Sequence, residues 1–313
     1  MSSTPHDHPL PPPRVEEVSD GVYAYVQPDG SWWINNTGFL AGRRGVIGID
    51  ACSTERRTRA YREAIAAVTD RPVTTLVNTH HHGDHTFGNH LFPEATIVGH
   101  ERTRELVLAD GIPAYRTLVW SPDVEWGELE AVPPFLTYTD RVTLYSDELR
   151  CEVRHVGVAA HTTNDSFVWI PERRLLFSGD LLFNGGTPFV LMGSVTGALE
   201  ALDQLERLGA ETIVPGHGDV CGPEVIARVR GYLRFVQETA ERGRAAGLTP
   251  LETARETDLG EWAALLDSER IVGNLHRAYA ELAGLPPGGD IDLVAAIGDM
   301  ITLNGGRPLS CLA

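Results

Sequence analysis

The side chains of His80, His82, Asp84 and His85 could bind metal, and they lie close together in one short segment. Imidazole nitrogens and carboxylate oxygens are ligands that zinc and similar divalent ions accept. The preceding run Val73–Val77 is short and β-branched, which predicts a buried strand. The cluster is therefore expected on a loop at the end of a strand. On such a loop His80 and His82 can share one metal ion while Asp84 and His85 reach a second.

Three further candidate ligands lie downstream, at His161, Asp180 and His217. Each follows an apolar run typical of a strand, with glycine nearby to let the backbone approach an ion. We expect two ligand sets, His80/His82/His161 and Asp84/His85/His217, with Asp180 bridging the two metals. Three protein ligands and a bridge leave room for water at each ion, which is typical of catalytic sites and not of structural ones.

The run Gly45–Asp50 also predicts a buried strand, and the aspartate at its end has two interpretations. Its carboxylate can accept the second N–H of a metal-binding histidine, or it can cap the segment that follows. We favour the first, because metal-bound histidines usually donate their other N–H to such a group.

The ordered pattern H-x-H-x-D-H, followed by His161, Asp180 and His217, resembles the metallo-β-lactamase superfamily. The resemblance covers most of residues 15–222. It implies an α/β fold, a four-layer αββα sandwich with a dinuclear metal site at one edge of its two sheets. His81 falls at a variable position and is not expected to be a ligand. Ala159 stands where many members carry proline.

A narrower resemblance extends nearly from end to end of the chain. It rests on Gly21–Val26, Asn78–Asn89, Val124–Glu128, Thr187–Val195, Ile271–Ala278 and Asn304–Ala313. These segments are similar to the second-ring cyclases of aromatic polyketide biosynthesis, of the actinorhodin-pathway type. The resemblance implies an intramolecular aldol condensation and dehydration that closes the second ring of a polyketide. It leaves open hydrolysis of the thioester that links such a substrate to an acyl carrier protein or to coenzyme A.

The expected cofactors are two adjacent divalent ions, with zinc as the first choice and iron or manganese as alternatives. They would activate water and polarise a carbonyl. Asp84 is the candidate catalytic residue, because a carboxylate ligand can orient the water or relay a proton. The chain contains no lysine, so aldol chemistry here must rely on metal and not on an imine.

Three other functions compete with the cyclase. A thioesterase or ester hydrolase of the glyoxalase-II kind, without cyclase activity, is the main alternative, although its glutathione-binding branch usually relies on basic residues including lysine. A lactonase or β-lactamase is disfavoured by Asp180, since one class of true β-lactamases carries cysteine there, and by the missing export signal. A non-enzymatic scaffold with a vestigial site would not need seven intact ligand positions.

Composition narrows the choice of partners and compartment. A net charge of −17 argues against a nucleic-acid partner, because phosphate contacts need a basic face. No apolar run approaches the length that crosses a bilayer, and the leader, residues 1–14, lacks the core of a signal peptide. We therefore expect a cytoplasmic protein with a small-molecule substrate. Its four cysteines form no C-x-x-C pair and are expected to be reduced and mostly buried.

Residues 15–222 are expected to form the catalytic domain, and residues 223–313 a helical extension. Val22–Val26 and Trp32–Leu40 predict an N-terminal hairpin, and Thr54–Val68 predicts a helix outside the sheet. Helices are expected at 223–241, 250–256, 268–282 and 291–303. This extension would cover the active site or build an interface between two copies of the chain.

Trp32, Phe189 and Met192 are predicted to contact the substrate. Trp32 and Trp33 lie in the expected hairpin, where one would face the substrate and the other the core. Phe189 and Met192 belong to a glycine-rich segment just after Asp180. The insert 111–135, rich in proline and aromatic residues, is expected to form a lid or pocket wall, or simply to cover the core.

Overall fold

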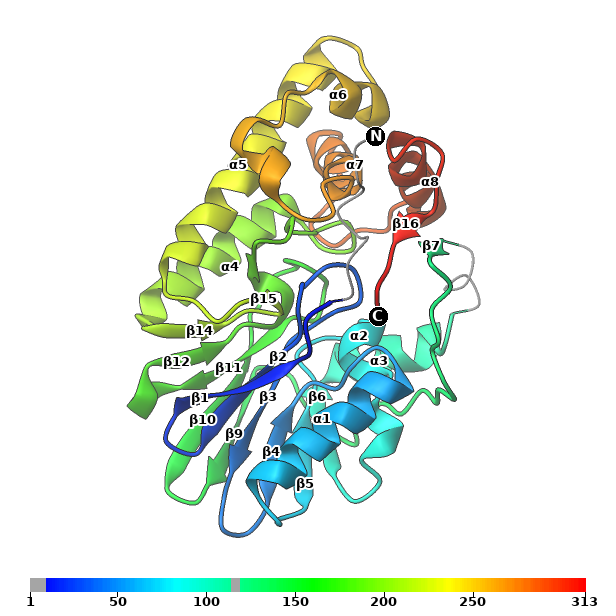
Figure 1. The fold of residues 1–313 in the computed structure, drawn as a ribbon. Coiled ribbons are helices and arrows are strands. Elements are labelled where there is room, and N and C mark those ends of the chain that lie inside the picture. The colour runs from blue at the N-terminus through cyan, green and yellow to red at the C-terminus, as the bar shows by residue number, and fades with distance from the viewer. Residues whose placement is uncertain (1–9, 114–118) are drawn as a thin grey trace.

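Two β-sheets lie face to face at the centre of the structure, with helices on both outer faces (Figure 1). The structure is a computed structural model that describes residues 10–113 and 119–313. Most of the expected leader, residues 1–9, therefore lies outside the described residues, as does part of the insert 111–135. The arrangement is the four-layer αββα sandwich that the sequence predicts, with extra helices at the C-terminal end.

The first sheet has seven strands. In spatial order they are β1 (Arg14–Ser19), β2 (Val22–Val26), β3 (Thr37–Ala41), β4 (Val46–Ile49), β5 (Val73–Val77), β6 (Thr96–His100) and β8 (Leu136–Tyr138). β1 starts at the last residue of the expected leader. Pairing is antiparallel from β1 to β4 and parallel from β4 to β8. Parallel strands end at the same edge of a sheet, so the predicted ligand loop after β5 emerges at that edge.

The second sheet has five strands, and only β12 and β14 pair in parallel. In spatial order they are β14 (Thr212–Val214), β12 (Leu175–Phe177), β11 (Ser166–Ile170), β10 (Leu149–His155) and β9 (Arg141–Ser146). Along β11, Val168 and Ile170 pack between the two sheets, whereas Phe167 and Trp169 face the outer helices. Both faces of this strand are buried, which explains its unbroken apolar sequence.

Helices cover each outer face of the sandwich. α1 (Glu55–Val68) and α3 (Glu101–Asp110) lie against the first sheet, and α4 (Val195–Leu208) and α5 (Glu224–Ala245) lie against the second. α1 begins as predicted because the Thr54 side chain caps it, accepting a hydrogen bond from the N–H of Arg57. Tyr61 and Ile65 then pack the helix onto the sheet.

The C-terminal helices gather at one end of the sandwich (Figure 1). They are α6 (Pro250–Glu256), α7 (Arg270–Leu282) and α8 (Leu293–Leu303), and each overlaps a predicted helix. After α8 the chain returns through β16 (Leu309–Ser310), which pairs in parallel with β7 (Trp120–Ser121) of the insert. No helix in the described part of the chain is both long enough and apolar enough to span a membrane.

Short elements connect these layers. They are α2 (Gly83–Thr86), η1 (Asn89–Leu91), η3 (Pro171–Arg173), η4 (Gly179–Leu181), η5 (Gly260–Ala264) and the parallel pair β13 (Phe183–Asn184) and β15 (His217–Gly218).

The predicted strand Trp32–Leu40 is wrong in its first half. β3 begins only at Thr37, and residues 27–36 form a loop. Side chains in this loop replace sheet pairing: Nδ2 of Asn36 donates a hydrogen bond of 2.9 Å to the carbonyl of Pro215, after β14. Such a contact between distant segments leaves no mark in local alternation. The loop crosses the end of the sandwich instead of extending its sheet.

Candidate metal centre

Loops at one end of the two sheets bring all seven predicted metal ligands together. His80 and His82 follow β5, Asp84 and His85 lie in α2, His161 follows β10, Asp180 lies in η4 after β12, and His217 begins β15. They form two overlapping groups that share Asp180. Each group has the composition expected from the sequence.

The first group consists of His80, His82, His161 and Asp180, whose potential ligand atoms all lie within 4.8 Å of one another. Nε2 of His161 is 2.9 Å from Nδ1 of His82 and 3.3 Å from Oδ2 of Asp180. Atoms this close, all lone-pair donors, can surround one cation.

The second group consists of Asp84, His85, His217 and again Asp180, with the same 4.8 Å limit. Nε2 of His85 is 3.1 Å from Oδ1 of Asp180, and Nε2 of His217 is 3.4 Å from its Oδ2. Nε2 of His217 is also 3.3 Å from Oδ2 of Asp84. Asp180 thus faces both groups, the position that a bridging carboxylate requires.

The histidines are oriented by hydrogen bonds on the far side of their rings. The acceptors for Nδ1 are Oδ2 of Asp50 for His85 at 2.8 Å, the carbonyl of Phe189 for His161 at 2.5 Å, and the carbonyl of Gly30 for His217 at 3.1 Å. Because each Nδ1–H donates outward, the Nε2 lone pair of the neutral ring points into the cluster.

Asp50 occupies the accepting position that the sequence analysis favours. Besides accepting from His85, its carboxylate accepts hydrogen bonds of 2.8 Å from the backbone N–H and from the hydroxyl of Thr79. The Thr79 oxygen in turn lies 3.1 Å from Nδ1 of His80. One carboxylate therefore positions a histidine in each group.

The chemistry of the cluster fits a pair of divalent cations. Among the described residues, Nε2 of His80 is buried without a hydrogen-bond partner, and Nε2 of His85 and Oδ1 of Asp180 have only each other, at 3.1 Å. Each such atom costs about 1–3 kcal/mol unless something satisfies it. Cations in the two groups would satisfy all three. The backbone packs tightly against the carboxylate of Asp180, since a Cβ at Gly216 would overlap its Oδ1.

Burial and neighbouring charges set the protonation of the cluster. Burial lowers the pKa of His80 and of His82 well below the usual histidine range, so both rings are neutral. Burial opposes ionisation of Asp180, but His217 and His85 outweigh it and hold its pKa well below the usual range. Against the effect of burial, Asp180 raises the pKa of His217 to about 9. A cation in the second group must therefore displace a proton.

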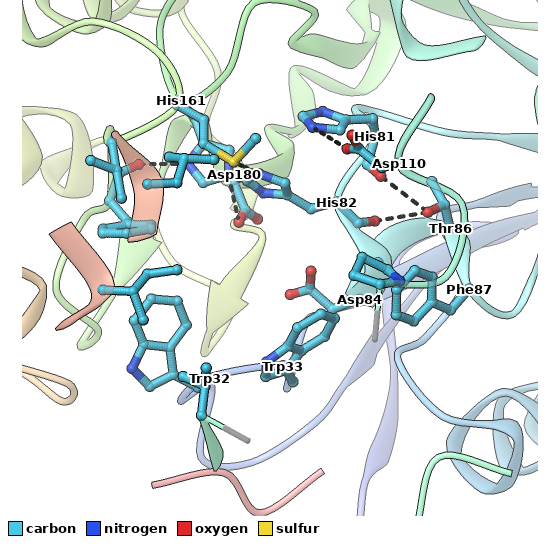
Figure 2. Close-up of a pocket in the computed structure, with 18 of the residues that line it drawn as sticks. Trp32, Trp33, His81, His82, Asp84, Thr86, Phe87, Asp110, His161 and Asp180 are labelled. Carbon is cyan, nitrogen blue, oxygen red and sulfur yellow. Dashed lines mark hydrogen bonds and ion pairs between the residues drawn. The ribbon is translucent and has the colours of Figure 1, made fainter. Parts of the chain in front are cut away.

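A cavity of about 1210 Å³, including its open mouth, lies beside the two groups (Figure 2). Trp32, Phe189 and Met192, the predicted substrate contacts, all line it. Trp33 lines it as well, and its ring also packs on Phe87 and Trp126 of the core, so the structure does not divide the two roles between the two tryptophans as expected. The loop at residues 27–36 turns both rings toward the cavity, across from His82 and His161 in Figure 2.

The remaining walls come from distant parts of the chain. Trp120, from the insert, lines the cavity and packs edge-to-face on Trp33. Trp126, also from the insert, packs edge-to-face on Trp33 but is not among the residues that line the cavity. The C-terminal extension contributes Arg270, Leu293, Ile297, Met300 and Leu309. Sequence reasoning missed these five residues. The apolar ones, Leu293, Ile297, Met300 and Leu309, carry no local sign that they face a ligand and not a core, and Arg270 carries no sign that it is buried at the cavity.

A family model for the metallo-beta-lactamase superfamily matches residues 30–217, a range that contains every ligand described above. The chain belongs to this superfamily. It is 30% identical over 212 residues to the 2,4-dinitroanisole O-demethylase subunit alpha of Nocardioides sp., a match that covers 65% of this chain and 55% of that one. It is 27% identical over 190 residues to the acyl-coenzyme A thioesterase MBLAC2 of Bos taurus, covering 55% of this chain and 64% of the relative.

Among solved structures, the superfamily fold recurs in the sec-alkylsulfatase Pisa1 from Pseudomonas sp. The TM-score is 0.68 at 17% identity, over 87% of this chain and 50% of that one. At this identity the likeness concerns the fold alone.

Proposed function

We propose that the chain is a metal-dependent enzyme of aromatic polyketide biosynthesis that closes the second ring of its substrate by intramolecular aldol condensation and dehydration. The observation that carries the proposal is the cavity, in which aromatic walls open directly onto a two-metal ligand set. The end-to-end resemblance of the sequence to second-ring cyclases agrees with it. We propose further that the enzyme acts in the cytoplasm on a substrate held by an acyl carrier protein or coenzyme A.

The walls suit a flat, mostly uncharged ligand. Tryptophan and phenylalanine rings can stack on aromatic rings of the substrate. Arg270 is the one arginine among the described lining residues, and the chain has no lysine. It is 2% exposed, its Nη2 is 2.9 Å from Asp267, and its guanidinium lies 3.9 Å from the ring centroid of Trp32. Glutathione bound within the cavity would therefore find little complementary charge for its two carboxylates.

Two divalent cations, zinc foremost, would be held by the two groups and would supply Lewis acidity and an acidified water when bound. Asp84 lines the cavity and is the proposed proton acceptor for the acidic CH₂ between two carbonyls of the substrate. The walls would fold the polyketide so that the deprotonated carbon meets the right ketone. They would also limit the entry of water, which favours ring closure over hydrolysis.

A thioester hydrolase without cyclase activity is the second candidate, and a specific observation favours it. The bovine relative is named as an acyl-coenzyme A thioesterase. The same carboxylate and cation pair would direct water at a thioester carbonyl. In the cyclase a deprotonated carbon of the substrate attacks a ketone, whereas in the hydrolase water attacks the thioester carbonyl. Which of these happens depends on the shape of the bound substrate.

Incubation of the zinc-loaded protein with a thioester-linked aromatic polyketide intermediate separates the candidates. Mass spectrometry should detect a product smaller by one water that carries a new ring. Release of the free acid without ring closure would reject the cyclase in favour of the hydrolase. Asp180→Ala should abolish either activity, and Gly186→Ala, whose added Cβ meets nothing nearer than 3.6 Å, serves as the control.

A further inference from the structure

We propose that His81 and Asp110 form a subsite that binds an enol or phenol hydroxyl of the substrate beside the metal centre. The proposal rests on the proposed function for the class of substrate. Both side chains line the cavity, and neither belongs to the two ligand groups. Figure 2 shows them next to one another, at the far end of the cavity from Trp32.

His81 offers the cavity a hydrogen-bond donor that no described residue uses. The residue is 6% exposed, and its Nε2 is buried with no hydrogen-bond partner in residues 10–113 and 119–313. Oδ2 of Asp110 lies 3.6 Å from this nitrogen, which is too long for a hydrogen bond. A polar atom unpaired at this depth is costly, so a ligand that reaches it gains affinity.

The hydrogen-bond network behind the ring decides which nitrogen carries the proton. Nδ2 of Asn164 lies 2.9 Å from Nδ1 of His81 and 3.0 Å from Oγ1 of Thr162. The Thr162 hydroxyl donates to Oδ1 of Asp165 at 2.6 Å, so its oxygen can only accept from Asn164. The amide of Asn164 therefore presents its NH₂ to both neighbours. Nδ1 of His81 must accept, and the ring proton lies on Nε2, on the cavity side.

Asp110 supplies a hydrogen-bond acceptor at a position where a carboxylate destabilises its own helix. It is the last residue of α3, and a carboxylate there opposes the helix dipole. Gly111 follows with φ 57°, a conformation that ends the helix and suits glycine. A residue that breaks a local rule in this way is often kept for function.

Hydrogen bonds through Asn164 connect the segments that carry His81, the donor, and Asp110, the acceptor. The hydroxyl of Thr103, in α3, donates a hydrogen bond of 2.9 Å to Oδ1 of Asn164, the same amide that orients His81. Thr103 and Asn164 are fully buried. The helix that carries Asp110 is thus tied to the loop that carries His81, so the two cavity-facing atoms keep their spacing.

A hydroxyl group matches this pair of atoms. Its oxygen accepts from Nε2–H of His81 while its own proton goes to Oδ2 of Asp110. A ketone oxygen can use only the donor, and an ether oxygen cannot donate at all. Enols and phenols are the hydroxyls that aromatic polyketides carry. Binding one of them here would fix which carbon of the substrate faces Asp84.

The test compares binding of 1-naphthol and 1-methoxynaphthalene to the full-length, zinc-loaded protein, followed by quenching of tryptophan fluorescence. We expect naphthol to bind about fivefold to tenfold more tightly, the effect of one added hydrogen-bonded group. Asp110→Leu should bring the ratio of the two dissociation constants close to one, because only naphthol can donate to Asp110, whereas His81→Phe should weaken the binding of both probes. Asp110→Asn keeps an acceptor oxygen and should retain most of the preference. Glu105→Leu, on the exposed side of the same helix, should change nothing.

Equal binding of the two probes by the wild type would overturn the subsite. So would a preference that survives Asp110→Leu, or a His81→Phe variant that binds both probes as tightly as the wild type. Metal content and thermal unfolding of each variant establish that the fold and the metal centre are intact. Asp110 is partly exposed, so its substitution keeps the test decisive even if His81→Phe does not fold. An intact, Asp110-dependent preference without ring-closing activity would reject the proposed cyclase alone.

Discussion

Oδ2 of Asp50 lies 2.8 Å from Nδ1 of His85, and Oδ1 of the same carboxylate accepts a hydrogen bond of 2.8 Å from the backbone N–H of Thr79. A side chain that would never touch the metal thus aims one ligand and fixes the loop that carries others. The ligands converge because this carboxylate, at the end of β4, reaches across to the loop after β5.

Replacing that carboxylate should weaken metal binding without unfolding the protein. Asp50→Asn keeps the size of the side chain and tolerates the φ of 60° at this position, but it loses the charge that holds the histidine. We expect zinc affinity, measured by competition with a chromophoric chelator, to fall about 10–100-fold. Asp147→Asn, also at positive φ but in a distant turn, is the matched control. Unchanged affinity in Asp50→Asn would reject the positioning role.

A methyl group on Gly216, which has no side chain that could bind metal, should also disrupt the metal centre. The Cβ added by Gly216→Ala would overlap Oδ1 of Asp180, so the bridging carboxylate must move. We expect this variant to retain at most one metal ion per chain in elemental analysis. Gly186→Ala has room for its Cβ and should keep both ions. Equal metal content in the two variants would show that the packing around Asp180 can relax.

The four thiols should be unreactive in the native protein. All four cysteines are free, and burial raises the pKa of Cys52, Cys151, Cys221 and Cys311 to about 12. At pH 8 only about one thiol in ten thousand would be ionised, and the thiolate is the reactive form. Ellman's reagent should therefore modify the native protein very slowly. After denaturation it should modify all four cysteines rapidly. Rapid reaction of a native thiol would contradict this.

His155 should make stability depend on pH at a site remote from the ligands. Its ring stacks on His100 with centroids 3.9 Å apart, and burial, followed by the nearby His100, lowers its pKa to about 4. In the unfolded chain the same group takes up a proton near pH 6.5. Between these values the unfolded state binds more protons, so the free energy of unfolding falls as the pH falls from about 6.5 to about 4.

Urea denaturation across this pH range measures the effect. His155→Gln should lose less stability than the wild type between about pH 6.5 and 4, and the two should run parallel above that range. A variant whose stability falls as steeply as that of the wild type would mean that His155 remains protonated in the folded state.

The sequence predicts the metal ligands because their information is local. Four of the ligands lie in one short segment just after β5: His80, His82, Asp84 and His85. The strand before them has a clear apolar pattern. The C-terminal helices were also predictable from their periodicity and from glycine and proline breaks. Trp32–Leu40 failed as a strand because Asn36 binds a carbonyl far along the chain, at Pro215.

Trp32, Phe189 and Met192 were predicted to line the substrate site and do line the cavity, but its other walls could not be predicted, for a related reason. Nε1 of Trp32 donates a hydrogen bond of 2.7 Å to Glu269, in a segment that the sequence places in a separate extension. The hydrogen bond between Asn164 and His81 likewise joins two segments that no local pattern connects. Residues that become neighbours only when layers assemble carry no periodic signal, so walls and subsites require the structure.

Seven side chains are expected to hold two cations around Asp180. Elemental analysis of the zinc-reconstituted protein, compared with Asp180→Ala, is the sharpest test of this arrangement. We expect two ions per chain in the wild type and at most one in the variant. A wild-type chain that retains no stoichiometric metal, or a variant that retains both ions, would contradict it.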